Sequence, residues 1–248
     1  MILTESSICS ITKLVLYGDE IMITYFNGTV FNTPAKALVN TVNTKGVMGA
    51  GIALEFSLRY PKMFKEYKER CDRAELSVGK IDYHKEDGIV IVNFPTKRHY
   101  RYDSKLEWIE DGLKHFVFTY KEQGISSVAF PRLGCSNGHL DWKDVQLLME
   151  KYLSNIDIMV YICLDNTDNA EGKEKEMVNF FNKTTENDFV TKLRMKPEQV
   201  KTLVKKQPIN RFWELNKVPE ISRSAYIKLF RYLYKMENDD EYEQVTLF

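Results

Sequence analysis

Short apolar runs alternate with amphipathic stretches along the first two thirds of the chain. The apolar runs are rich in β-branched residues and predict buried strands at 21–26, 36–42, 88–94, 125–133 and 157–165. The amphipathic stretches place apolar residues every three to four positions and predict helices at 52–59, 61–71, 105–123 and 141–153. Because strands that alternate with helices are joined by right-handed crossovers, we expect an α/β fold with a largely parallel or mixed sheet between helical layers.

Three residues mark where these elements are expected to begin or end. Pro95 is predicted to stop the strand 88–94, since proline has no N–H for the hydrogen bonds between strands. Ser104 is predicted to cap the N-terminus of the helix 105–123, and Gly124 is predicted to terminate that helix.

The pattern changes after Asp165. A polar, linker-like stretch follows, and the rest of the chain contains only helix-like segments, at 174–183, 197–206 and 222–236. We therefore predict two parts, a domain at 1–168 and a small helical module at 169–248 with an acidic end.

The overall composition and charge do not identify the ligand of this protein. The 248 residues are 44% hydrophobic and 28% charged, which is typical of a globular protein, and basic and acidic residues balance at 35 each. Residues 191–235, however, carry twelve basic and three acidic side chains, interleaved with aromatic ones. Such a segment suits a nucleic-acid backbone with occasional base stacking, and it equally suits a helical cap with an aromatic core and solvated lysines. Both interpretations stay open.

The four cysteines are scattered and lack the paired spacing of metal ligands. With neither a signal peptide nor an apolar stretch of membrane length, they indicate reduced thiols in the cytoplasm. We predict no metal, no cofactor and no membrane contact.

Three loops follow predicted strands, at 43–51, 95–104 and 134–140. In sheets of this type, ligands bind beyond the carboxyl ends of the strands. The first and third loops are rich in glycine and run into helices, and such turns expose backbone N–H groups that hold phosphate. One such loop alone could be a packing turn between helix and sheet. Two such loops on one rim of the sheet favour a site in which a diphosphate is held from both sides.

Three stretches carry a family resemblance: ALVNTVNTKGVMGAGIALEF, VNFPTKRHYRYDSKLEWIEDGL and PRLGCSNGHLDW. Together they closely resemble the macrodomain family. More narrowly, they resemble its DarG-type branch, the DNA ADP-ribosyl glycohydrolases that act as antitoxins to DarT DNA ADP-ribosyltransferases. The resemblance covers residues 21–165 and implies a three-layer α/β/α fold with ADP-ribose in a cleft at the rim of the sheet.

The resemblance also implies roles for single residues. Asn40 and Asn43 would line the distal ribose, and Lys97 corresponds to the lysine that is catalytic in the DarG-type and terminal-ADP-ribose branches. The first phosphate loop would consist of Gly49, Ala50, Gly51 and Ile52. The second would consist of Gly134, Cys135, Ser136, Asn137 and Gly138.

Two positions depart from the family pattern. Thr29 stands where many members have an aspartate that contacts adenine. Gly138 stands where the terminal-ADP-ribose branch has an aspartate, so Lys97 is expected to work without a carboxylate partner.

An N-glycosidic bond breaks through an oxocarbenium-like state, which a nucleophile or a proton donor to the leaving base can assist. Lys97 can attack only as a neutral amine, so its pKa must be lowered, by partial burial or by the charges of Lys45, Arg98 and Arg101. A protonated Lys97 could instead donate to the base. On composition alone, Lys97 would be an ordinary surface lysine.

Two neighbouring side chains have open roles. His99, with Tyr100, is expected to stack on or orient the substrate base, or else to anchor the loop. Cys135 is expected to be a small loop residue, since a nucleophilic thiol needs a nearby base.

The sequence therefore predicts a hydrolase that removes ADP-ribose from ADP-ribosylated DNA bases and reverses a DarT-like toxin, its possible partner. The basic module is expected to contact DNA. The alternatives are a hydrolase of protein-linked ADP-ribose and a non-catalytic ADP-ribose-binding module.

Overall fold

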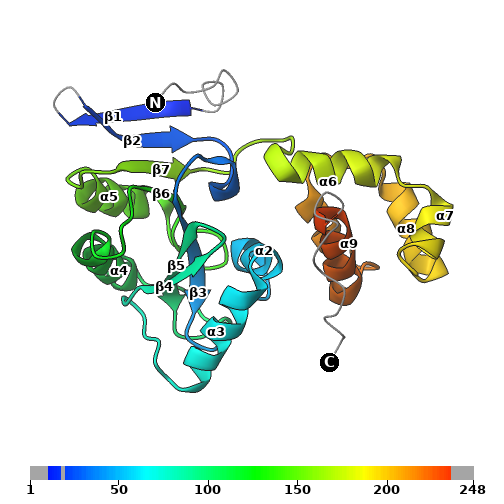
Figure 1. Ribbon diagram of the computed structural model, residues 1–248, viewed down its shortest axis with the longest axis horizontal. Coiled ribbons are helices and arrows are strands. Elements are labelled where there is room, and N and C mark those ends of the chain that lie inside the picture. The colour runs from blue at the N-terminus through cyan, green and yellow to red at the C-terminus, as the bar shows by residue number, and fades with distance from the viewer. Residues whose placement is uncertain (1–10, 18–19, 236–248) are drawn as a thin grey trace. The chain divides into compact units, whose positions relative to one another are not determined.

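The computed structural model describes residues 11–17 and 20–235, which form two compact units that divide between Asn166 and Thr167 (Figure 1). Cys9 and the acidic end at 236–248 lie outside the described residues. Across the described ranges, every helix is too short or too polar to cross a bilayer.

The first unit is built on a seven-stranded mixed sheet with the order β1-β2-β7-β6-β3-β5-β4. Its central strands pair in parallel, and the two outer strands β1 and β4 pair antiparallel with their neighbours. In chain order the strands are β1 (Ile11–Tyr17), β2 (Glu20–Phe26), β3 (Ala37–Asn43), β4 (Asp82–Glu86), β5 (Ile89–Lys97), β6 (Ser127–Pro131) and β7 (Met159–Cys163).

Apolar side chains alternate between the two faces of the central strands, as the period of a strand requires. Val39 and Phe94 pack on the face covered by α4 (Leu106–Thr119) and α5 (Trp142–Leu153). Leu38 and Ile91 pack on the opposite face. The elements on that face are η1 (Val30–Asn32), α2 (Gly51–Arg59) and α3 (Pro61–Asp72). In the view of Figure 1, α4 and α5 lie to the left of the strands and α2 and α3 to the right. The predicted three-layer α/β/α fold is confirmed.

The prediction that Pro95 ends its strand is wrong, because β5 continues to Lys97. The neighbouring strand β4 pairs with β5 only as far as Asn93, so the missing N–H of Pro95 breaks no ladder to β4. On the other side, Val42 pairs with Pro95 and the next residue of β3 pairs with Lys97, which leaves Thr96 as an extra residue. This bulge and the extension carry Lys97 to the rim of the sheet.

The N-cap of α4 is Lys105, so the prediction of Ser104 as the cap is also wrong. The Ser104 side chain is buried, and its Oγ has no hydrogen-bond partner among the described residues. Its main-chain N–H donates to the carbonyl of Gly138 over 3.0 Å, so Ser104 supports the second glycine loop instead. The helix ends at Thr119, before Gly124, which adopts a left-handed φ of 69° in the following turn.

The second unit consists of helices alone among its described residues. They are α6 (Gly172–Lys183), α7 (Glu186–Thr191), α8 (Pro197–Lys206), η2 (Phe212–Lys217) and α9 (Arg223–Lys235). Aromatic side chains form much of its core: Phe181, Phe189, Phe212 and Phe230 are buried, and the rings of Phe212 and Phe230 pack edge to face.

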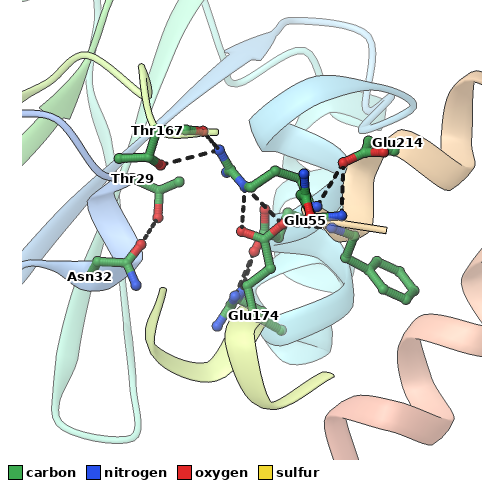
Figure 2. A network of polar contacts seen from close by, with 10 residues as sticks. Thr29, Asn32, Glu55, Thr167, Glu174 and Glu214 are labelled. Atoms are coloured by element: carbon green, nitrogen blue, oxygen red, sulfur yellow. Dashed lines mark hydrogen bonds and ion pairs between the residues drawn. The ribbon is translucent and has the colours of Figure 1, made fainter. Parts of the chain in front are cut away.

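A buried ion pair holds the start of this unit against α6. Arg211 Nε donates to Glu174 Oε2 over 3.1 Å, and its NH1 donates to the carbonyl of Thr167 over 2.8 Å. Glu214 Oε1 accepts from the Arg211 main-chain N–H over 2.7 Å, and Figure 2 shows these contacts around Glu174 and Glu214. Arg211 is therefore a structural residue and is not part of a basic surface.

Candidate functional site

The three rim loops of the first unit meet at Asn137. Lys97 Nζ, at the end of β5, donates a hydrogen bond to the main-chain carbonyl of Asn137. A Cβ atom placed on Gly51 would lie 3.1 Å from Asn137 Nδ2, so the two glycine loops approach closely. The structure thus brings together the predicted catalytic lysine and both predicted phosphate loops.

The first loop is held by the side chain of Asn43. Its Nδ2 donates to the carbonyl of Val47 over 2.5 Å, and its Oδ1 accepts from the main-chain N–H of Lys45 over 2.8 Å. Tyr67, from α3, donates its hydroxyl proton to the Asn43 carbonyl over 2.7 Å. Asn43 therefore shapes the turn that leads to Gly49, and its lining of a ribose stays a prediction.

Helix α2 begins at Gly51, whose φ of 56° lies in the left-handed region that favours glycine. The N-cap is Ala50, and no side chain in the described part of the chain caps this helix end. The first-turn N–H groups, including that of Ile52, have no partner within the helix and carry the positive end of its dipole. This end of α2 can hold an anion between Gly51 and the second loop.

The second loop is too tight for side chains at its two glycines. Gly134 has a φ of 68°. A Cβ on Gly138 would lie 2.3 Å from the carbonyl oxygen of Gly134 and 2.4 Å from Ser104 Oγ. An aspartate could not replace Gly138 without opening the loop, while Ser136 and Asn137 are exposed on it. The close packing explains why glycine stands at position 138, and the expectation that Lys97 works without a carboxylate partner stays a prediction.

Lys97 lies in a nearly closed environment, with 9% of its surface exposed. Burial lowers its pKa from the ordinary lysine value, and the carboxylate of Asp103 opposes this shift. The predicted help from positive neighbours is not found among the described residues: Arg98 lies over the Trp108 ring at 5.4 Å, and Arg101 over the Tyr100 ring at 5.6 Å. Burial alone moves Lys97 toward the neutral amine.

Asn40 belongs to a chain of buried polar side chains that crosses three strands. Its Nδ2 donates to Asn93 Oδ1 over 3.0 Å, and Asn93 Nδ2 donates to Asp82 Oδ2 over 3.1 Å. Arg70, from α3, pairs with Asp82, whose pKa burial nevertheless raises. Asn40 Oδ1 is buried and has no partner among the described residues. Sequence reasoning missed Asn93, although an amide within the apolar run IVIVNF was a signal.

Cys135 is not a nucleophile in this arrangement. Burial raises the pKa of its thiol to about 11, so the neutral form dominates at physiological pH. Its Sγ donates to the carbonyl of Leu133 over 3.4 Å. His139 Nδ1 lies 2.7 Å from Asp103 Oδ1. These contacts favour the interpretation of Cys135 as a small loop residue.

At the position where many macrodomains carry aspartate, Thr29 closes a local turn. Its Oγ1 donates to Asn32 Oδ1 over 2.6 Å, which joins the N-cap of η1 to its last residue (Figure 2). The Thr29 hydroxyl proton is thus used within the turn.

Aromatic side chains follow Lys97 on the rim. The ring centroids of His99 and Tyr100 are 4.3 Å apart at 25°, and Tyr102 lies 5.1 Å from His99. The main-chain N–H of Arg101 donates to His99 Nδ1 over 3.2 Å, so His99 does anchor the loop. Contact of His99 with a substrate stays a prediction, and Tyr102 was not found by sequence reasoning.

Comparison with known proteins gives the same family in sequence and in structure. The Macro domain family model matches residues 39–149. The DNA ADP-ribosyl glycohydrolase of Mycobacterium tuberculosis (strain ATCC 25618 / H37Rv) is 47% identical over 147 residues, which is 56% of this chain and 42% of that protein. The chain thus spans about two fifths of the length of the DNA ADP-ribosyl glycohydrolases that it matches.

Two solved structures resemble the first unit. The macrodomain of Thermus aquaticus DarG is 36% identical with a TM-score of 0.55, and the match covers 58% of this chain and 98% of that one. Thermosipho africanus DarTG in complex with ADP-ribose is 34% identical with a TM-score of 0.55, covering 57% of this chain and 41% of that one.

Proposed function

Because this chain belongs to the macrodomain family, we propose that it is a glycohydrolase that removes ADP-ribose from ADP-ribosylated DNA bases. The observation that carries the proposal is the placement of Lys97. Lys97 is buried at the end of β5, its Nζ donates a hydrogen bond to the second glycine loop, and burial lowers its pKa. Similar proteins named DNA ADP-ribosyl glycohydrolase support the choice of DNA as substrate.

The diphosphate of ADP-ribose is proposed to lie between the two glycine loops. The uncapped first turn of α2 supplies N–H groups on one side, and the loop 134–138 faces Gly51 on the other. Asn40, Asn43 and His99 are proposed to contact the sugar and the base. In this proposal, the anomeric carbon of the distal ribose lies near Lys97.

Lys97 has two possible roles in breaking the N-glycosidic bond. As a neutral amine it attacks the anomeric carbon while the bond to the base nitrogen breaks, and the departing base takes up a proton that the amine releases. Water then hydrolyses the lysine–sugar adduct. As an ammonium it instead donates its proton to the departing base while water attacks the carbon. The lowered pKa of Lys97 favours the first role.

A DarT-like transferase is the proposed partner of this activity. A Thermosipho africanus relative, 36% identical over 156 residues, is a DNA ADP-ribosyl transferase–glycohydrolase fusion protein. We place the activity in the cytoplasm, since the three cysteines among the described residues are free thiols, as a reducing compartment favours.

The second unit is proposed to add contacts to the DNA backbone. Arg211 is buried and Lys192 pairs with Asp188, so neither is free to contact DNA. Helix α8, however, carries exposed lysines at 201, 205 and 206. Exposed lysines near one another attract phosphates and release counterions.

Two substrates test the function. The protein should release ADP-ribose from an ADP-ribosylated DNA oligonucleotide, detected by mass spectrometry, and Lys97→Ala should not. Release only from a glutamate-linked ADP-ribosyl protein would replace DNA with protein as the substrate. Binding of ADP-ribose with release from neither substrate would make the protein a non-catalytic ADP-ribose reader.

A further inference from the structure

The turn that follows Lys97 is a small, preformed aromatic surface. The main-chain N–H of Tyr102 donates to the His99 carbonyl over 3.2 Å, and the N–H of Arg101 donates to His99 Nδ1 over 3.2 Å. His99 thereby fixes the turn with both its main chain and its ring. Its ring also touches both neighbouring tyrosine rings, at 4.3 Å for Tyr100 and 5.1 Å for Tyr102.

This surface is unusually open to solvent. Tyr100 is 43% exposed and Tyr102 is 69% exposed. In the described part of the first unit, five large hydrophobic side chains are exposed, and three of them lie between residues 100 and 106. Exposed apolar side chains gathered in one place indicate a binding surface, whereas single ones are ordinary.

Basic groups lie beside Tyr100 and beside the nearby ring of Trp108. The Arg101 guanidinium lies 5.6 Å from the Tyr100 ring centre, and Arg98 and Lys105 each lie 5.4 Å from that of Trp108. Rings with cations between them suit a polyanionic chain with flat groups attached, since the cations meet phosphates while the rings stack on bases.

We propose that the turn 99–102 is a stacking platform for the nucleotides that neighbour the ADP-ribosylated base. The substrate is then a modified base within an unpaired DNA strand, because only unpaired bases can turn their faces to Tyr100 and Tyr102. This inference rests on the proposed function and goes beyond it: Lys97 and the glycine loops act on the ADP-ribosyl group, and the platform selects the strand that carries it. Because His99 already orders the turn, little entropy is lost when a strand binds.

The test is the dependence of KM on strand length. With the full chain, an ADP-ribosylated single strand of about five nucleotides should have a KM about tenfold below that of an ADP-ribosyl mononucleotide, through stacking of a few bases. The variant Tyr100→Ala/Tyr102→Ala should lose this dependence. Tyr100→Phe/Tyr102→Phe should retain it, since phenylalanine keeps the flat ring and removes only the hydroxyl.

Phe118→Ala is the matched control. Phe118 is 79% exposed at the far end of α4 from the turn, and its removal should leave the dependence on strand length as in the wild type. The platform is disproved if the double alanine variant keeps the wild-type length dependence, or if the wild type cleaves a fully paired duplex as efficiently as the single strand.

A second measurement separates this inference from the proposed function. Binding of a labelled, unmodified single-stranded oligonucleotide should be weakened about tenfold by Tyr100→Ala/Tyr102→Ala and left unchanged by Phe118→Ala. Each protein carries the same second unit, so its contribution cancels. Failure of the wild type to cleave any ADP-ribosylated DNA would overturn the function alone, whereas equal binding by all three proteins would overturn the platform alone.

Discussion

At the scale of single residues, the decisive property is the burial of one lysine. Lys97 keeps 9% of its surface exposed, and its hydrogen bond goes to a neutral carbonyl and not to a carboxylate. Withdrawal from water lowers the pKa of the Lys97 ammonium and outweighs the opposing effect of the Asp103 carboxylate, which is what a nucleophilic amine needs.

Replacing Lys97 should separate binding from turnover. Lys97→Ala should keep ADP-ribose affinity nearly intact, since the proposed diphosphate site uses the loop backbone, and should lower turnover by about a hundredfold or more. Lys97→Arg should fail to restore turnover, because a guanidinium stays protonated and cannot attack carbon. Calorimetry and single-turnover release of ADP-ribose measure the two effects. Wild-type turnover in the alanine variant would exclude both proposed roles of Lys97.

The pH profile distinguishes the two roles. Because the pKa of Lys97 is lowered, the neutral amine is populated at a lower pH than for an exposed lysine. If the amine is the nucleophile, the rate should rise with pH through this lowered pKa, and a hydride reductant should trap a covalent sugar adduct. If the ammonium is the proton donor, the rate should fall across the same range, and no adduct should form.

At the scale of elements, the site depends on where strands end and helices begin. The bulge at Thr96 carries β5 past Pro95, and α2 starts with a left-handed glycine beside the second loop. Neither loop encloses a ligand alone. The two loops approach each other at Gly51 and Asn137, where the diphosphate is proposed to bind.

A charged side chain at position 51 should block the proposed diphosphate site. Gly51→Glu should abolish 1:1 binding of ADP-ribose in calorimetry, because the new carboxylate fills the space beside Asn137 and repels phosphate. Gly88→Glu is the control: Gly88 also has a left-handed φ, 74°, and nothing lies within 4 Å of the added Cβ. Both variants place a glutamate at a left-handed φ and make the same change in net charge. Unchanged affinity in Gly51→Glu would contradict the two-loop phosphate site.

At the scale of the whole molecule, basic side chains are concentrated in one segment of the second unit. The segment 191–235 has nine more basic than acidic side chains, although the chain as a whole is neutral. Part of this excess is used internally, since Arg211 is buried against Glu174 and Lys192 pairs with Asp188. The lysines of α8 are among the basic side chains that remain exposed, and they are proposed to contact DNA.

Reversing the charge of α8 should therefore change how DNA binding responds to salt. Lys201→Glu/Lys205→Glu/Lys206→Glu should weaken DNA binding. The slope of log affinity against log salt concentration should become less steep by up to about 2–3, since fewer counterions are released. Lys62→Glu/Lys65→Glu/Lys68→Glu, on α3, makes the same change in net charge and should leave the slope near that of the wild type. Equal slopes for the wild type and the α8 variant would make the second unit a structural or protein-binding module.

The sequence by itself determined the central strands, most of the helices and the three rim loops. Apolar periodicity is a local signal, and the central strands are apolar on both faces, so 36–42 and 157–165 were recognisable without knowledge of their partners. Glycine requirements are local as well. The motifs around Gly51, Lys97 and Gly138 could be read for the same reason, and they carried the family resemblance.

Only the tertiary structure decided which polar residues are buried and where the edges of the sheet lie. The outer strand β4 reads DYHKE and shows no apolar pattern, because it is defined by pairing with β5. Pro95 continues a strand because β4 has already ended beside it. Arg211 is buried because Glu174, 37 residues away, neutralises it, and Lys97 loses water because Asn137, 40 residues away, closes over it. A charged side chain becomes buried, and a strand pairs at the edge of a sheet, only through partners that are distant in sequence. No local sequence pattern contains those partners.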